Sequence, residues 1–139
     1  KWSSKLAILR AFNKTINDYL ILMPSDRFEN ELTYEFKTIK GIKKPYLSVS
    51  LSNILKQTRV PDNSDFAPPP NGYALLNFDA GFTLKIRKQP VEIGFGGNNL
   101  LNTVYRDYLN RFRYYADGIG RNFTLRIKVP FNFSPKKSN

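Results

Sequence analysis

Residues 28–37 read FENELTYEFK, and apolar and polar side chains alternate along most of this stretch. Successive residues of a β-strand point to opposite sides, whereas a helix would scatter the same residues around its axis. The stretch therefore predicts a strand with one largely apolar face and one charged face. The first face comprises Phe28, Asn30, Leu32, Tyr34 and Phe36, and the second comprises Glu29, Glu31, Thr33, Glu35 and Lys37.

The same period of two recurs along the rest of the chain. The alternating segments are residues 2–12, 28–37, 47–52, 73–87, 91–96 and 122–131. The first segment is less regular than the others, because Arg10 falls among its apolar positions. No segment has a convincing helical period. We therefore expect an all-β chain of about six antiparallel strands.

The connections between these segments differ in length. Residues 40–45 and 87–90 are short and turn-like, whereas residues 15–27, 56–72 and 100–121 form long connections. Short turns on one side and long loops on the other are typical of outer-membrane barrels. About 10 residues tilted by ~40° rise roughly 25 Å, which is the height of the apolar band of such a barrel. The pattern predicts a segment of an antiparallel up-and-down transmembrane β-barrel.

Six strands are too few to close a barrel, for which roughly eight is the practical minimum. The alternation also begins at the first residues of the sequence. We therefore expect the end of a larger barrel, incomplete without its other strands, or an open sheet that pairs with something else. A soluble antiparallel sandwich explains the alternation equally well, but it explains the strand length and the loop asymmetry less well.

The composition excludes several kinds of chemistry. The 139 residues include 22 Lys and Arg and 11 Asp and Glu, for a net charge of +11, and there is no Cys and no His. A disulfide scaffold, thiol catalysis and a histidine proton shuttle are therefore excluded. We expect no enzyme activity, no cofactor and no metal site. The basic excess is compatible with nucleic acid, anionic lipid or an acidic partner.

Two features of the polar strand faces have competing interpretations. Glu29, Glu31 and Glu35 share one face of one strand, either as an acidic patch or as a solvated face balanced by bases of the Arg126 or Lys128 type; we favour the second. The glycines at positions 94, 96 and 97 do not have the spacing of a dinucleotide fingerprint, and no helix follows them. Glycine inside a strand more often marks a close approach of another backbone segment or a kink.

The connection over residues 100–121 is rich in arginine and tyrosine. Its members are Arg106, Arg111, Arg113 and Arg121 together with Tyr105, Tyr108, Tyr114 and Tyr115. Arginine and aromatic rings together can bind nucleic acid. The alternative is a loop packed by its own aromatic rings and pinned by Arg–Asp pairs, for which Asp107 and Asp117 are available. We favour this alternative.

Residues 94–131 contain a series of short motifs. They are Asn99–Leu100–Leu101–Asn102, then Tyr105, Arg106, Asp107 and Tyr108, then Arg111, Phe112 and Arg113, and finally Gly120, Arg121 and Asn122 before the last alternating strand. In this order they resemble the C-terminal end of a TonB-dependent outer-membrane receptor of the Bacteroidetes type. The family usually stops at a terminal aromatic residue, whereas here Phe131 is followed by a polar tail at residues 132–139.

The resemblance implies a 22-stranded, plug-filled barrel of the bacterial outer membrane that imports a scarce nutrient such as a siderophore, haem, cobalamin or a glycan. Residues 1–131 would supply its last six strands, with the short turns periplasmic and the long loops extracellular. The implied partners are the rest of the barrel and its plug, the TonB system through an N-terminal part outside this sequence, outer-membrane lipid and lipopolysaccharide, and a small-molecule or glycan substrate, but no nucleic acid. The alternative is a soluble basic antiparallel β domain that binds nucleic acid or another polyanion.

Substrate contacts in such a receptor would come from the tips of the long loops. The candidate substrate-binding residues are Asp62, Asp65, Phe66, Tyr108, Arg111, Arg113 and Tyr115.

Overall fold

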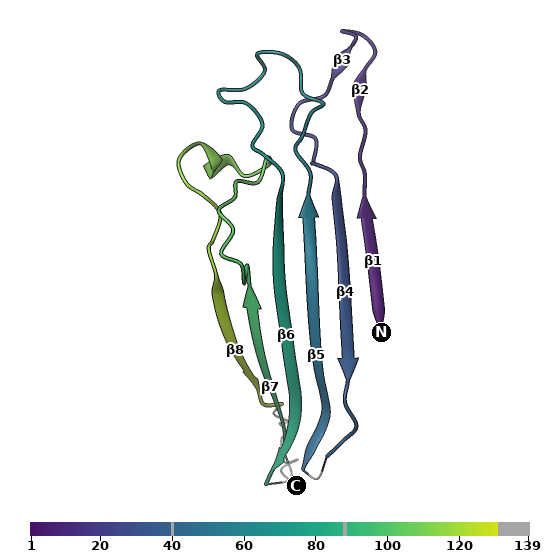
Figure 1. Ribbon diagram of the computed structural model, residues 1–139, viewed down its shortest axis with the longest axis vertical. Coiled ribbons are helices and arrows are strands. Elements are labelled where there is room, and N and C mark those ends of the chain that lie inside the picture. The colour runs from purple at the N-terminus through teal and green to yellow at the C-terminus, as the bar shows by residue number, and fades with distance from the viewer. Residues whose placement is uncertain (40, 88, 131–139) are drawn as a thin grey trace, which may run out of the picture.

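The computed structural model describes residues 1–39, 41–87 and 89–130, and its main element is a six-stranded antiparallel sheet (Figure 1). The strands are β1 (Trp2–Ala7), β4 (Arg27–Glu35), β5 (Ile42–Ile54), β6 (Tyr73–Ile86), β7 (Gln89–Asn98) and β8 (Asn122–Lys128), and they lie side by side in this order. Two shorter strands, β2 (Phe12–Asn13) and β3 (Asp18–Tyr19), form a separate hairpin. The all-β fold predicted from the alternation is confirmed, and the sheet is open, with β1 and β8 as its edges.

The register of the sheet gathers the apolar residues on one side. Residues directly opposite each other in antiparallel strands share a face. Trp2 lies opposite Leu32, Leu32 opposite Val49, and Val49 opposite Phe78. A second row consists of Tyr34, Leu47, Ala80, Phe95 and Leu125. Within the described ranges no paired position on this side, which we call the apolar face, holds a charged residue.

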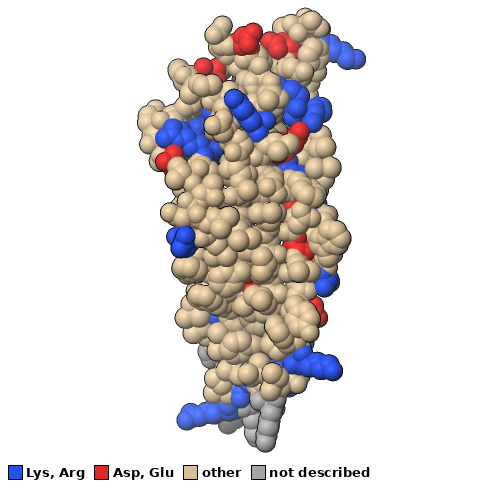
Figure 2. Space-filling model, viewed as in Figure 1, with Lys and Arg blue, Asp and Glu red and all other residues tan. Residues whose placement is uncertain are grey.

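The side chains of the apolar face are mostly exposed or half-buried, although Val91 is buried. Trp2 is 75% exposed, Leu32 63% and Leu125 66%. The only buried hydrophobic residues in the described part of the chain are Ile54, Val91 and Tyr108. Figure 2 shows a surface that is largely uncharged over the strands, with Lys and Arg gathered towards the two ends. The second layer that a soluble sandwich needs is not found among the described residues, where each main strand contacts only its neighbours in the sheet.

The opposite, polar face carries a network of hydrogen bonds and ion pairs. Asp79 on β6 accepts a hydrogen bond from the Tyr46 hydroxyl and forms an ion pair with Arg126 on β8. A Cβ on Gly94 would lie 3.1 Å from the Arg126 guanidinium, and one on Gly96 would lie 3.2 Å from Asp79 Oδ2. The groups that come close to these two glycines are thus the side chains of the Asp79–Arg126 pair, whereas the sequence predicts a backbone approach or a kink.

Two of the three glutamates of β4 have partners on adjacent strands. Glu29 pairs with Lys5 of β1 at 3.4 Å, and Glu31 accepts a hydrogen bond of 2.7 Å from a serine hydroxyl of β5. Arg126 and Lys128 pair instead with carboxylates of β6 and β7. A cross-strand base therefore balances Glu29, in line with the favoured interpretation, but this base is Lys5, because β5, β6 and β7 separate β4 from Arg126 and Lys128.

The two short connections are tighter than the sequence predicts. The turn expected at residues 40–45 is replaced by β5 from Ile42 onwards, and an isolated bridge joins Ile39 to Ile42. Gly41 has a φ of +87°, which glycine adopts without a steric penalty. The turn expected at residues 87–90 is likewise shortened, because β7 begins at Gln89. Residues 40 and 88 themselves lie outside the described ranges.

A β-bulge explains how β5 can begin so early. Lys43 and Tyr46 are three residues apart on β5, but their partners on β6 are only two residues apart. The bulge leaves Pro45 outside the ladder, where its missing N–H disrupts no cross-strand hydrogen bond. Ile42 and Leu47 consequently share the apolar face although they are five residues apart.

The connection expected to be irregular over residues 15–27 contains regular structure at its start. β1 ends at Ala7, and the chain then forms the β2–β3 hairpin, so the alternation up to Phe12 is not one continuous strand. Asn13 closes the hairpin, because its side-chain oxygen accepts a hydrogen bond of 2.9 Å from the Thr15 N–H. The rings of Phe12 and Tyr19 pack edge to face at 5.5 Å between centroids.

The predicted difference in connection length is confirmed in space. The connections over residues 8–26, 55–72 and 99–121 all lie at one end of the sheet, and the tight turns lie at the other (Figure 1). β8 ends at Lys128 rather than at residue 131, while Phe131 and the tail at residues 132–139 lie outside the described residues. Among the described residues, no helix is long and apolar enough to cross a membrane.

Candidate functional site

A pocket of about 910 Å³ opens between two of the long connections, residues 55–72 and 99–121. We call it the loop pocket. Its lining residues are Lys56, Phe66, Ala67, Pro68, Pro69, Pro70, Asn71, Arg106, Arg111, Arg113, Tyr114 and Tyr115. The lining thus combines cations, aromatic rings and a run of three prolines, and it includes no carboxylate.

The two connections are joined by a clamp centred on Arg113. Its side chain is only 4% exposed and forms an ion pair with Asp65 of the other connection. The guanidinium also lies over the rings of Tyr108 and Tyr114, at 4.9 and 4.7 Å from their centroids. The Tyr114 hydroxyl donates a hydrogen bond to Asp65. This hydrogen bond, together with the charge of Arg113, holds the pKa of Asp65 below its ordinary value.

A short 3₁₀ helix, η1 (Arg111–Tyr114), presents the clamp. The Asn110 side chain caps it by accepting a hydrogen bond of 3.0 Å from the Phe112 N–H. Arg106 braces it from outside, because its guanidinium donates to the Arg113 carbonyl at 2.9 Å and pairs with Asp117 at 2.6 Å. The Arg106–Asp117 pair bears out the predicted pinning of this loop by an Arg–Asp pair, whereas Asp107, the other carboxylate expected in this role, pairs with Arg27 outside the loop.

The structure places the seven predicted substrate-binding residues in three different settings. Phe66, Arg111, Arg113 and Tyr115 line the loop pocket. Asp65 and Tyr108 lie behind the lining. Asp65 pairs with Arg113, and the ring of Tyr108 packs beneath the Arg113 guanidinium. Asp62 is exposed on its loop and is not part of the pocket lining.

Several lining residues were missed by the sequence reasoning. Lys56 lies two residues after the end of β5. Arg106 and Tyr114 belong to the loop that the sequence predicts to be packed by its own aromatic rings and pinned by Arg–Asp pairs. The prolines at positions 68–70 form a run within the long connection predicted over residues 56–72. That run was the visible signal of a stiff wall, because each proline ring fixes φ near −65°.

The base of the 99–121 connection is fixed by Asn99, which is 2% exposed and has a φ of +50°. Its side-chain oxygen accepts from the Thr103 N–H at 2.8 Å, and its amide donates to the carbonyls of Thr103 and Ile119 at 2.9 and 3.3 Å. Asn102 similarly accepts from the Arg121 N–H at 2.9 Å. The two asparagines of the Asn-Leu-Leu-Asn motif therefore hold together the two ends of this connection.

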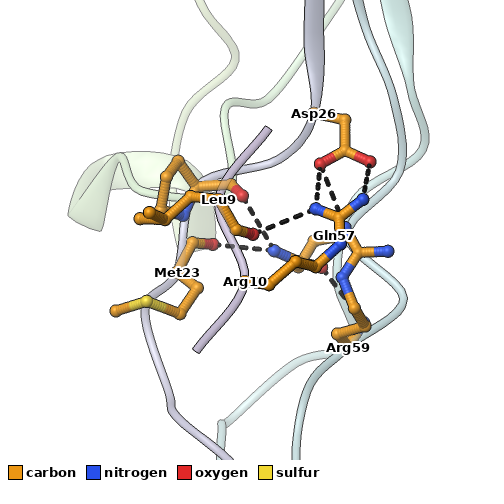
Figure 3. Close-up of polar contacts among 7 residues, drawn as sticks. Leu9, Arg10, Met23, Asp26, Gln57 and Arg59 are labelled. Carbon is orange, nitrogen blue, oxygen red and sulfur yellow. Dashed lines mark hydrogen bonds and ion pairs between the residues drawn. The ribbon is translucent and has the colours of Figure 1, made fainter. Parts of the chain in front are cut away.

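A second cluster joins the 8–26 and 55–72 connections (Figure 3). Arg10 binds both carboxylate oxygens of Asp26, at 2.6 and 2.8 Å, and Arg59 contacts the same carboxylate at 3.1 Å. The hydrogen bond from Arg10 and the charge of Arg59 hold the pKa of Asp26 below its ordinary value. Gln57, which is 1% exposed, donates to the Met23 and Pro24 carbonyls. No buried side-chain nitrogen or oxygen of the described residues lacks a hydrogen-bond partner, and we interpret the cluster as a structural tie between the two connections.

A third tie connects the 99–121 connection to the strands. Asp107 accepts a hydrogen bond of 2.9 Å from the Tyr73 hydroxyl at the start of β6 and pairs with Arg27 of β4 at 3.0 Å. The ring of Tyr105 lies 4.5 Å from that of Tyr73, between centroids. The long connections are therefore held together at one end of the sheet, and the loop pocket has ordered walls.

The described residues contain no group of three or more carboxylates that could hold a metal ion. In comparisons with known proteins, no family model, no curated protein and no solved structure matches this chain.

Proposed function

We propose that this chain is part of a TonB-dependent receptor of the bacterial outer membrane, and that its six strands form a section of the transmembrane barrel. The receptor would import a scarce nutrient such as a siderophore, haem, cobalamin or a glycan. The observation that carries the proposal is the continuous, uncharged and exposed apolar face of the sheet. The motifs at residues 99–122, which resemble the end of such a receptor, support the choice of family.

The apolar face supports a lipid environment on energetic grounds. Moving one Val, Leu or Phe side chain from water into apolar surroundings is worth about 1.5–3 kcal/mol. Many such side chains lie on this face, and no second layer covers them within the described part of the chain. In a barrel wall the apolar face would contact lipid, while the polar face would contact the plug and the water-filled interior.

The open edges and the connections support the same arrangement. β1 and β8 each have only one partner strand, so a barrel would provide their second partners. The long connections would lie outside the cell and the tight turns in the periplasm. Anionic lipopolysaccharide and the rest of the barrel would be direct partners, and the TonB system would act through the N-terminal part of the receptor.

Accessibility from outside the cell tests the proposal. Because the chain has no cysteine, Ser64→Cys in a long connection and Thr38→Cys in a tight turn can each be labelled with a membrane-impermeant maleimide in the full-length protein. We expect Ser64→Cys to react in intact cells and Thr38→Cys to react only after the outer membrane is permeabilised. Equal labelling of both variants in intact cells, or recovery of the protein without detergent in the soluble fraction, contradicts the proposal.

The second candidate function is that of a soluble basic β domain that binds nucleic acid or another polyanion. The net charge of +11 and the cations of the loop pocket favour it. It predicts a protein that stays in solution without detergent and binds an oligonucleotide with an affinity that falls steeply as salt is raised.

A further inference from the structure

Two of the four cations that line the loop pocket have no carboxylate partner among the described residues. Four of its twelve lining residues are Lys or Arg, and none is Asp or Glu. Arg106 and Arg113 are engaged by Asp117 and Asp65 behind the lining. Lys56 and Arg111 form no ion pair with any other residue in the described ranges. The pocket therefore presents two exposed positive groups whose natural complement is negative charge on a ligand.

The remaining walls of the pocket are rings. The side chain of Phe66 is completely exposed and that of Tyr115 is 86% exposed, although both are large and apolar. The three prolines at positions 68–70 form an adjoining wall. Exposed aromatic faces of this kind stack on flat or ring-shaped partners. Because the Asp65–Arg113 clamp already orders both connections, a ligand would bind without a large cost of ordering them.

The hollows on the polar face of the sheet differ from the loop pocket in the charge of their lining. The larger one, of about 850 Å³, is lined by Lys44, Arg126 and Lys128 but also by Glu35 and Glu92. Several of these charges are compensated within the sheet by the pairs described above. An anionic ligand would therefore find a less favourable potential there than in the loop pocket.

We propose that the loop pocket binds a small acidic ligand that carries carboxylate groups on sugar or aromatic rings. Arg111 would bind a carboxylate through two parallel N–H groups, and Lys56 would contact a second anionic group. The rings of the ligand would stack on Phe66 and Tyr115. That the bound ligand is an import substrate rests on the proposed function. The binding of the ligand can be measured independently of that function.

The size and charge of the pocket favour a small ligand over a nucleic acid. Proteins that bind single strands use a positively charged groove that follows the backbone over several nucleotides. Here the two uncompensated cations belong to one pocket of about 910 Å³, which lies within the usual size range of small-molecule sites.

Isothermal titration of the purified full-length protein tests the proposal. The ligands are oligogalacturonate, its fully methyl-esterified form, benzene-1,3,5-tricarboxylate, inorganic sulfate and a single-stranded oligonucleotide. We expect oligogalacturonate or the tricarboxylate to bind at least tenfold more tightly than both the uncharged ester and sulfate, and the tighter of the two identifies the ring type. Arg111→Gln should weaken this binding by about tenfold, as expected for loss of one charge-assisted contact. Lys14→Gln on the β2–β3 hairpin makes the same change of charge outside the pocket and should leave the affinity unchanged.

Four outcomes would overturn the proposal. They are equal binding of the methyl ester, equal binding of sulfate, equal losses in Arg111→Gln and Lys14→Gln, and tighter binding of an oligonucleotide than of either carboxylate. The maleimide experiment distinguishes this failure from failure of the proposed function. If the protein is embedded in the membrane but does not bind acids, only the proposed ligand class is refuted. If the protein is soluble and does bind acids, only the assignment as a receptor is refuted.

Discussion

Replacing Leu125 with Arg would place a guanidinium on the apolar face at the centre of β8. Leu125 is the fourth of seven residues in this strand, and it lies opposite Phe95 of β7. Three residues on either side correspond to about 10 Å of strand in each direction. In a membrane, Leu125 therefore lies near the midplane of the apolar band, where Arg costs about 2–4 kcal/mol.

The cost of Arg is best measured against Ala at the same position, so that loss of the original side chain cancels. At Leu125 we expect Arg to lower the free energy of unfolding by about 2–4 kcal/mol relative to Ala. At Phe123, which lies two residues and therefore roughly 5 Å further from the midplane, the same comparison should give a smaller cost than at Leu125. At Thr124, which points to the polar face opposite Gly96, the difference should be close to zero.

The assay is reversible urea unfolding of the full-length protein in lipid vesicles, followed by tryptophan fluorescence. Equal costs at positions 124 and 125 would refute the assignment of the two faces. Equal costs at positions 123 and 125 would refute the lipid environment, because a protein core has no dependence on membrane depth. The three positions adjoin one another on one strand, so differences in local backbone stability are small.

Three further predictions concern the connections and the sheet. Asn99→Ala should lower the free energy of unfolding by about 1–3 kcal/mol, measured by urea unfolding, because it leaves buried backbone groups without partners. The hydrogen bond from Tyr114 lowers the pKa of Asp65, so the Asp65 carboxylate should stabilise the loop clamp above the ordinary carboxyl pKa of about 4. This stabilisation should be lost as the pH falls through the lowered pKa. Hydrogen exchange of residues 56–72 measured against pH tests this, and a loop whose exchange does not respond to acid would contradict it. Gly97→Ala should cost about 1–3 kcal/mol in the same unfolding assay, because its Cβ would overlap the Phe78 ring, and a neutral effect would show that the ring moves freely.

The strands and their faces could be predicted from the sequence because alternation is a local property. The stretch around Leu32 indicates both the strand and its apolar side without knowledge of any partner. The predicted apolar residues that lie within the six strands do share one face of the sheet, whereas Phe12 lies in the separate β2–β3 hairpin. The exact ends were less predictable, since β5 begins earlier and β8 ends earlier than the alternation suggests.

The candidate site could be predicted only in part, because its contacts join distant parts of the chain. Asp65 and Arg113 are 48 residues apart, and nothing in either loop sequence specifies the other as a partner. The sequence did indicate a loop rich in Arg and Tyr with carboxylates nearby. It could not indicate that Tyr108 would be buried beneath Arg113, nor that Asp62 would lie outside the pocket.

The bulge between Lys43 and Tyr46 has a consequence for how the length of this sheet can change. Inserting or deleting one residue within a strand transfers every later side chain to the other face, whereas a change of two residues preserves the faces. The bulge supplies one unpaired extra residue that returns Ile42 to the apolar side. Length variants of this chain should therefore tolerate changes by even numbers inside strands, while an odd change should be tolerated only with a compensating bulge.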